Sequence, residues 1–161
     1  MYRMPMRLKL ALVTLAAAAA TVLVAPTPAL AAPDSLACSA AGSYSRVVFG
    51  TATTYWLVGS VGNYRYWHAV RPTVPETYLR SYVVLCSGST ISSSTDLFVT
   101  SSSGARCGTA SSVDAQYVGS HNNVVGGVTY AFRYWHMKRF VSSGTFGFWV
   151  YDHSELARCA V

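Results

Sequence analysis

The sequence contains one motif twice, and this duplication limits the folds that the chain can adopt. The motif is a glycine, four variable residues, an aromatic residue, Arg-Tyr-Trp-His and a further arginine. We call the shared tetrapeptide the RYWH motif. The two copies comprise Gly59, Tyr64, Arg65, Tyr66, Trp67, His68 and Arg71, and Gly127, Phe132, Arg133, Tyr134, Trp135, His136 and Arg139. A repeated unit predicts one supersecondary structure that is built twice and packs against its own copy.

The cysteines are duplicated with the motif. Cys38 and Cys86 flank the first copy, and Cys107 and Cys159 flank the second. Four cysteines allow three pairings, and the duplication favours Cys38–Cys86 and Cys107–Cys159, one bridge in each unit. A loop of about 50 residues closed by each bridge would contribute roughly 4 kcal/mol to stability. No pair of cysteines has the C-x2-4-C spacing of a structural zinc site, so we predict no metal and no cofactor.

The first 31 residues have the pattern of a secretory signal peptide. Three basic residues precede an apolar stretch at 10–25, and Ala29-Leu30-Ala31 supplies the small residues that signal peptidase recognises. The apolar stretch is short for a membrane span of roughly 20 residues. We therefore expect cleavage near Ala31 and a secreted, extracellular protein, which is the setting in which disulfides persist.

Charge excludes one class of partner. Cleavage would remove three of the 12 basic residues and none of the six acidic residues, so the net charge falls from +6 to +3. A nucleic-acid site needs clustered Lys and Arg, and Lys138 is the only lysine beyond residue 31. Charges and glycines interrupt every later apolar run. We predict no nucleic-acid partner and no membrane span.

Short runs of Val, Tyr and Trp between Gly, Ser, Asn and Pro predict an all-β protein. The runs are 46–49, 53–58, 64–70, 80–85, 115–118, 128–139 and 145–151, and 154–158 is expected to form one turn at most. We divide the chain into a first β repeat at 32–88, a Ser/Thr-rich connector at 89–106 with a possible edge strand, and a second β repeat at 107–161. The predicted fold is a duplicated antiparallel β-sandwich, or a small barrel, with two pseudo-symmetric halves and one disulfide in each repeat.

Strand parity divides each motif between two faces. One face carries an Arg–Trp–Arg set, namely Arg65, Trp67 and Arg71 in the first copy and Arg133, Trp135 and Arg139 in the second. If this face is exposed, its flat rings and guanidinium groups suit sugar rings, carboxylates or an aromatic side chain of a partner. The alternative is that both tryptophans anchor the core, with the arginines stacked beside them.

The other face carries the tyrosines and histidines. Tyr66, His68, Tyr134 and His136 would form an inter-repeat site if the two copies meet, and a histidine pair there could act in catalysis or bind a metal. No carboxylate is duplicated with the motif, so a histidine bonded to a neighbouring strand is the simpler interpretation. We assign no catalytic residue. Asp152-His153 beside many serines does not make a triad, because no G-x-S-x-G sequence occurs.

The sequence favours a non-catalytic binding module for an extracellular protein or a glycan. Exported β domains with disulfides and few acidic residues commonly present a rigid surface to a ligand. Two other classes stay open. One is a structural protein of the cell surface, which agrees with the high Tyr, Ser and Gly content. The other is a small secreted hydrolase that uses the repeated histidines, and it requires them to approach each other or an acid in a cleft.

Overall fold

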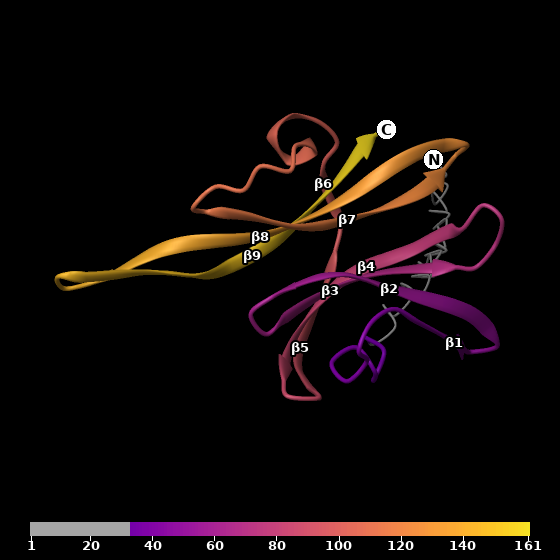
Figure 1. Ribbon diagram of the computed structural model, residues 1–161, viewed down its shortest axis with the longest axis horizontal. Helices are drawn as coiled ribbons and strands as arrows, with labels where there is room; N and C mark the ends of the chain where they lie inside the picture. Colours follow the sequence, from indigo (N-terminus) through magenta and orange to yellow (C-terminus); the bar gives the residue numbers. More distant parts are fainter. Residues whose placement is uncertain (1–32) are drawn as a thin grey trace, which may run out of the picture. The chain divides into compact units, whose positions relative to one another are not determined.

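The computed structural model describes residues 33–161, in which the secondary structure is almost entirely β (Figure 1). The predicted signal peptide, residues 1–31, lies outside the described residues. The strands are β1 (Tyr44–Val48), β2 (Thr51–Val61), β3 (Tyr64–Arg71), β4 (Thr77–Ser87), β5 (Thr90–Leu97), β6 (Val99–Ser101), β7 (Ala115–Val125), β8 (Val128–Ser143) and β9 (Phe146–Ala160). A short 3-10 helix, η1 (Gly104–Cys107), precedes β7. The all-β prediction is confirmed, but the expected turn at 154–158 is wrong because those residues continue β9.

The strands form one mixed sheet rather than a purely antiparallel one. Its order is β1-β2-β3-β4-β7-β8-β9-β6, with β5 paired to β4. Neighbours within β1–β5 and within β7–β9 are antiparallel. The two groups join through a single parallel pairing, Thr77 with Val124, and β6 is parallel to β9. Parallel neighbours need a long crossover instead of a hairpin, and the segment between β4 and β7 provides it.

Both predicted disulfides are present. Cys38 is bonded to Cys86 and Cys107 to Cys159, with Cα–Cα distances of 5.6 Å in each pair. In the first unit the bridge joins β4 to the turn region before β1, and in the second it joins β9 to η1. Each bridge therefore fixes an otherwise irregular segment to a strand next to a motif strand.

The motif residues of β3 and β8 are largely buried on both faces of their strands. One core cluster includes residues from both groups of strands, namely Tyr66, Val83, Leu97, Phe132, Tyr134 and Leu156. Trp67 belongs to a second cluster with Ala37, Cys38 and Tyr82, and Trp135 belongs to a third with Ala115 and Met137. The tyrosine face of each motif thus lies in the cluster to which both repeats contribute. The tryptophan face of each motif packs against residues of its own repeat.

The glycine that begins the sequence motif does not have the same role in the two copies. Gly59 lies opposite Tyr66, and Gly119 lies opposite Tyr134, each at an irregular point of its strand pair. A Cβ on Gly59 would stand 2.7 Å from the Val118 carbonyl oxygen, and one on Gly119 would stand 2.6 Å from that of Val58. Gly127, with φ +80°, lies in the β7–β8 turn. The equivalence of Gly59 and Gly127 is therefore wrong, and Gly119 is the counterpart.

Candidate functional site

The Arg–Trp–Arg face does not form an exposed platform. Trp67 is 0 % exposed and Trp135 is 1 % exposed, so both indole rings are closed to a ligand. The platform hypothesis for the tryptophans is wrong, and the alternative, that they anchor the core, describes the structure. The physical reason is that the segments carrying Cys38 and Cys107 cover this face of each motif strand.

The motif arginines hold those covering segments in place. Arg65 donates hydrogen bonds to the carbonyl oxygens of Cys38 and Ala40, at 2.9 and 2.6 Å. Arg133 donates to the Gly108 carbonyl at 2.9 Å. The guanidinium of Arg65 also lies 5.2 Å from the ring centroid of Trp67, within cation–π range. These arginines therefore bind the chain's own backbone.

Of the remaining members of the set, Arg71 is the last residue of β3 and Arg139 lies within β8, opposite Val150. Arg106, which is outside the motif, stacks on Trp135 at 5.3 Å, and its carbonyl accepts a hydrogen bond from the Trp135 indole. Arg71 and Arg139 are exposed. Arg139 forms an ion pair with Asp152 at 3.2 Å. The structure thus does not bring Arg71 or Arg139 together with an accessible tryptophan of the motif.

The four residues of the inter-repeat site do come together. The Tyr66 hydroxyl is hydrogen-bonded to His136 Nδ1 at 2.8 Å, and the Tyr134 hydroxyl is hydrogen-bonded to His68 Nδ1 at 2.8 Å. Each motif thus supplies the tyrosine that binds the histidine of the other. A serine completes each pair, since Ser154 bonds Tyr66 at 3.0 Å and Ser81 bonds Tyr134 at 2.5 Å.

Burial keeps these groups uncharged. Burial, with a smaller contribution from nearby His121, lowers the pKa of His68 to about 3. Burial and then Lys138 lower the pKa of His136, while burial raises the pKa of both Tyr66 and Tyr134. Residues 33–161 contain no cluster of three or more His, Cys, Asp or Glu side chains suited to a metal. The arrangement is a neutral hydrogen-bond network that links β3 and β8 and includes one serine each from β4 and β9.

Removing one hydroxyl from this network should destabilise the fold. Tyr134→Phe leaves His68 without its Nδ1 partner, and the Nε2 atom of His68 already lacks a partner among the described residues. We expect the free energy of unfolding to fall by about 1–3 kcal/mol, measured by urea denaturation. Tyr117→Phe is the control, because the Tyr117 hydroxyl makes no hydrogen bond within residues 33–161, and it should change stability by less than about 0.5 kcal/mol. Equal effects of the two substitutions would contradict the network.

Stability should also depend on pH through the buried histidines. Their folded pKa values lie below the unfolded value, so the stability they confer is present above about pH 6.5 and is lost as the pH falls. For His68 the decrease should approach 1.4 kcal/mol per pH unit between roughly pH 6 and 4. Urea denaturation at pH 7, 6 and 5 measures it. His68→Asn should flatten this dependence, and a wild-type stability that rises on acidification would contradict the burial of neutral histidines.

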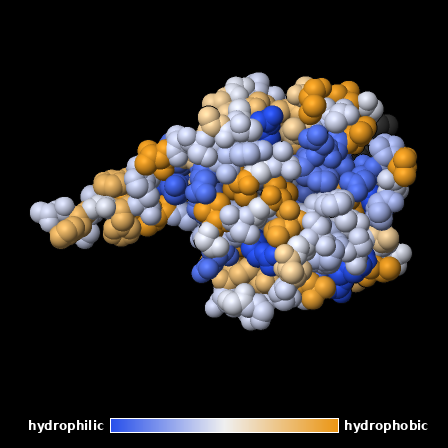
Figure 2. Space-filling view, in the orientation of Figure 1, coloured by the Kyte–Doolittle hydropathy of each residue, from blue (hydrophilic) through white to orange (hydrophobic). Residues whose placement is uncertain are grey.

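A cluster of exposed aromatic residues lies just beyond the second RYWH motif, on a projecting hairpin. β8 and β9 continue beyond the rest of the sheet, and we call residues 139–150 the arm (Figure 1). Its exposed fractions are 56 % for Phe140, 79 % for Phe146, 53 % for Phe148 and 40 % for Trp149. Figure 2 shows apolar residues along this projection. The sequence predicted the two strands, but their aromatic residues were indistinguishable from core residues.

Register places aromatic side chains on both faces of the arm. Phe140 lies opposite Trp149, and Val141 lies opposite Phe148. Because neighbouring cross-strand pairs point to opposite faces, these two pairs occupy different sides of the ribbon. The Phe140 and Trp149 rings pack edge to face with centroids 5.4 Å apart. Phe140 also covers Gly147, where a Cβ would stand 2.0 Å from its ring.

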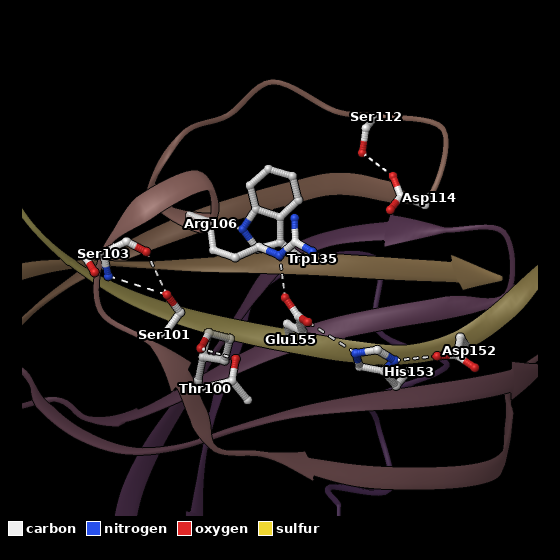
Figure 3. Close-up of polar contacts among 11 residues, drawn as sticks. Thr100, Ser101, Ser103, Arg106, Ser112, Asp114, Trp135, Asp152, His153 and Glu155 are labelled. Carbon is white, nitrogen blue, oxygen red and sulfur yellow. Dashed lines mark hydrogen bonds and ion pairs between the residues drawn. The ribbon is translucent and has the colours of Figure 1, made fainter.

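A network of charges fixes the base of the arm (Figure 3). His153 Nδ1 bonds Asp152 at 2.7 Å and Nε2 bonds Glu155 at 3.3 Å, and Glu155 is paired with Arg106. The bond to Asp152 raises the pKa of His153. Although partial burial acts the other way, hydrogen bonds from Arg106 and His153 lower the pKa of Glu155. Both ring nitrogens of His153 bind carboxylates, so neither is left to activate a serine.

Comparisons add no family to these observations. No protein-family model, curated protein sequence or solved structure matches the chain. Within residues 33–161 no helix has the length and apolar character needed to cross a bilayer. The functional argument therefore rests on the sites themselves.

Proposed function

We propose that this chain is a non-catalytic extracellular binding module that engages another protein through its arm. The observation that carries the proposal is the exposure of four aromatic rings on two strands that project from the sheet. Aromatic residues are enriched at protein interfaces, and an exposed cluster of them marks a surface that binds a partner. Secretion after cleavage near Ala31 belongs to the same proposal and is supported by the two disulfides.

The edges of the arm favour a protein over a glycan at this surface. Among the described residues β7 pairs with β8 only as far as Met137, and β6 pairs with β9 only at Leu156 and Ala157. Within the arm the two strands pair with each other alone, so both outer edges present free backbone donors and acceptors. An extended segment of a partner can add to such an edge while its side chains contact the exposed rings.

The buried motifs leave the other function classes with less support. The hydrolase hypothesis needs histidines in a cleft, whereas His68 is 0 % and His136 is 5 % exposed. Their partners are tyrosines of the opposite motif, and no carboxylate is bonded to them in the described chain. A structural role at the cell surface would use the same arm for contacts between copies of the chain. The test below separates that role from binding to a different protein.

We also infer that the two units are pseudo-symmetric halves that pack as a sandwich. The reciprocal Tyr–His bonds support this relation, because each half donates the same residue type to the other. The paired close approaches at Gly59 and Gly119 support it as well. A shared core cluster with residues from both groups of strands is what face-to-face packing requires. The duplicated motif then builds a rigid base from which the arm projects.

A photo-crosslinking competition tests the proposed function. A benzophenone group placed at position 148 should capture a discrete protein from the extracellular fraction of the producing organism. Excess unlabelled wild type should abolish this capture, whereas unlabelled Phe146→Ser/Phe148→Ser should compete at least tenfold less well. Phe98→Ser removes a ring that is 68 % exposed outside the arm and should compete like wild type. Capture of another copy of the chain would support the structural role, and equal competition by both variants would refute binding through the arm.

A further inference from the structure

The register of the arm shows where its backbone amides point. The Lys138 amide donates to the Asp114 carbonyl, so it points toward β7 and away from β9. Amide direction alternates along a strand, because opposite residues of an antiparallel pair are alternately bonded to each other and directed outward. At every second residue after Lys138, the amides of Phe140 and Ser142 therefore point outward as well. These two residues form the β8 edge of the arm.

The same register fixes the amides of the other edge. Trp149 lies opposite Phe140, and Gly147 lies opposite Ser142. Because both residues of a non-hydrogen-bonded pair direct their amides outward, Gly147 and Trp149 face the outer edge of β9. Within residues 33–161 neither of them pairs with any strand except β8. The β9 edge thus carries free N–H donors and carbonyl acceptors at every second residue.

Most of the exposed rings of the arm belong to β9. Phe146 and Phe148 point to one face of the arm, and Trp149 points to the other. β8 contributes only Phe140 to these exposed rings. Cross-strand pairs that include an aromatic side chain stabilise a sheet. A strand added to β9 would lie beside rings on both faces, whereas a strand added to β8 would lie beside one ring. The rings therefore favour the β9 edge.

A β-bulge and charged side chains limit the β9 edge at the base of the arm. The register shifts there and leaves Asp152 as an extra residue of β9. Asp152 is bonded to His153 (Figure 3) and forms the ion pair with Arg139. Bulges and charges are features that end strand pairing. The edge open to a partner is therefore 146–151, and residues 140–151 contain no charged side chain.

This inference rests on the proposed role of the arm. We propose that the β9 edge receives an extended, uncharged segment of the partner protein, about six residues long, as an added strand. Its backbone carbonyls accept from the amides of Gly147 and Trp149. Its β-branched or aromatic side chains pack against Phe146 and Phe148 on one face and beside Trp149 on the other. A charged residue in the middle of the segment would find no partner charge along the arm.

Two backbone substitutions test the edge without changing a side chain. An ester in place of the amide at Trp149 removes an outward N–H of β9 and keeps the indole. The same ester at Phe140 removes an outward N–H of β8 and is the matched control. Loss of one hydrogen bond should weaken peptide binding roughly three- to tenfold for the Trp149 ester, and the Phe140 ester should bind like wild type. Both esters should melt at the same temperature.

The probe is a phage-displayed library of random nonapeptides, selected on the oxidised, secreted protein. We expect selected peptides to have an uncharged centre rich in Val, Ile, Thr and aromatic residues. In the unmodified protein, bound peptide should slow hydrogen exchange at Gly147 and Trp149. Protection of Phe140 and Ser142 instead, or equal binding by both esters, would overturn the proposal. Self-association that the Trp149 ester abolishes would assign the edge to a second copy and also overturn it.

The side-chain variant of the arm separates this inference from the proposed function. Phe146→Ser/Phe148→Ser should bind the selected peptides at least tenfold more weakly than wild type. If this variant loses binding while the Trp149 ester keeps it, the arm binds a partner but not by strand addition. If the variant binds the peptides like wild type, the proposed role of the arm fails as well.

Discussion

Replacing Trp67 with alanine should lower the free energy of unfolding by about 3–5 kcal/mol. The indole is 0 % exposed and packs edge to face with Tyr44 at a centroid distance of 5.4 Å. Its Nε1 atom has no hydrogen-bond partner within residues 33–161, so the loss reflects packing and the cavity left behind. Urea denaturation monitored by circular dichroism measures the change. Trp135→Ala should have an effect of similar size, with the bond to the Arg106 carbonyl lost in addition.

The same substitution at an exposed tryptophan of the arm shows whether the loss of stability in Trp67→Ala depends on burial of the ring. Trp149 is 40 % exposed, and Trp149→Ala should cost no more than about 1 kcal/mol. The same variant should reduce capture of a partner by the arm. An unchanged stability of Trp67→Ala together with a loss of ligand binding would place Trp67 on the surface, contrary to the structure.

Reduction of the disulfides should have the second large effect. The bridges Cys38–Cys86 and Cys107–Cys159 span 48 and 52 residues. Constraint of the unfolded chain by loops of that length is worth about 4 kcal/mol for each bridge, and a typical domain has only about 5–15 kcal/mol in total. We therefore expect the fully reduced protein to be largely unfolded. Urea denaturation with and without reductant, followed by circular dichroism, tests this.

Variants with one bridge removed show what each disulfide does locally. Cys38→Ala/Cys86→Ala should loosen the segment that covers Trp67, since it would then be held without its covalent bond, by the Arg65 hydrogen bonds and the Arg46–Asp34 ion pair. Hydrogen exchange should accelerate first in residues 34–40, while β8 and β9 keep their protection. Equal stability of the oxidised and reduced proteins would contradict the stabilising role of the bridges.

Local signals in the sequence were sufficient for most of the strands and for the disulfides, whereas most of β5 and the end of β9 were missed. Alternation of large apolar residues between turn residues marks β3 and β8, and duplication selects one pairing of the cysteines from three. The same duplication suggested that Tyr66, His68, Tyr134 and His136 meet, because two copies of one strand that pack together bring equivalent residues close. The structure adds that each tyrosine binds the histidine of the other copy.

These sequence patterns did not predict which side chains are exposed to solvent. Parity separates the two faces of a strand but does not show that an irregular segment, held by Arg65 or Arg133, covers the second face. In the arm, conversely, the sequence pattern is typical of core residues although the side chains are exposed. Phe146 and Phe148 alternate along β9 like core residues. Their exposure and that of Trp149 arise because, among the described residues, β7 pairs with β8 only as far as Met137. Gly59 and Gly127 lie the same number of residues before the RYWH motif, and this equal spacing suggested equal roles. Their positions in the structure differ because the β7–β8 hairpin is longer than the β2–β3 hairpin.

Fluorescence quenching of the motif tryptophans tests the central claim most directly, namely that both RYWH motifs are core strands and that binding occurs elsewhere. Trp56→Phe/Trp149→Phe leaves only Trp67 and Trp135 as indole fluorophores. The structure predicts blue-shifted emission and weak quenching by acrylamide, rising to the quenching of a free indole only in urea. Red-shifted emission with strong quenching in the folded, oxidised protein would contradict it.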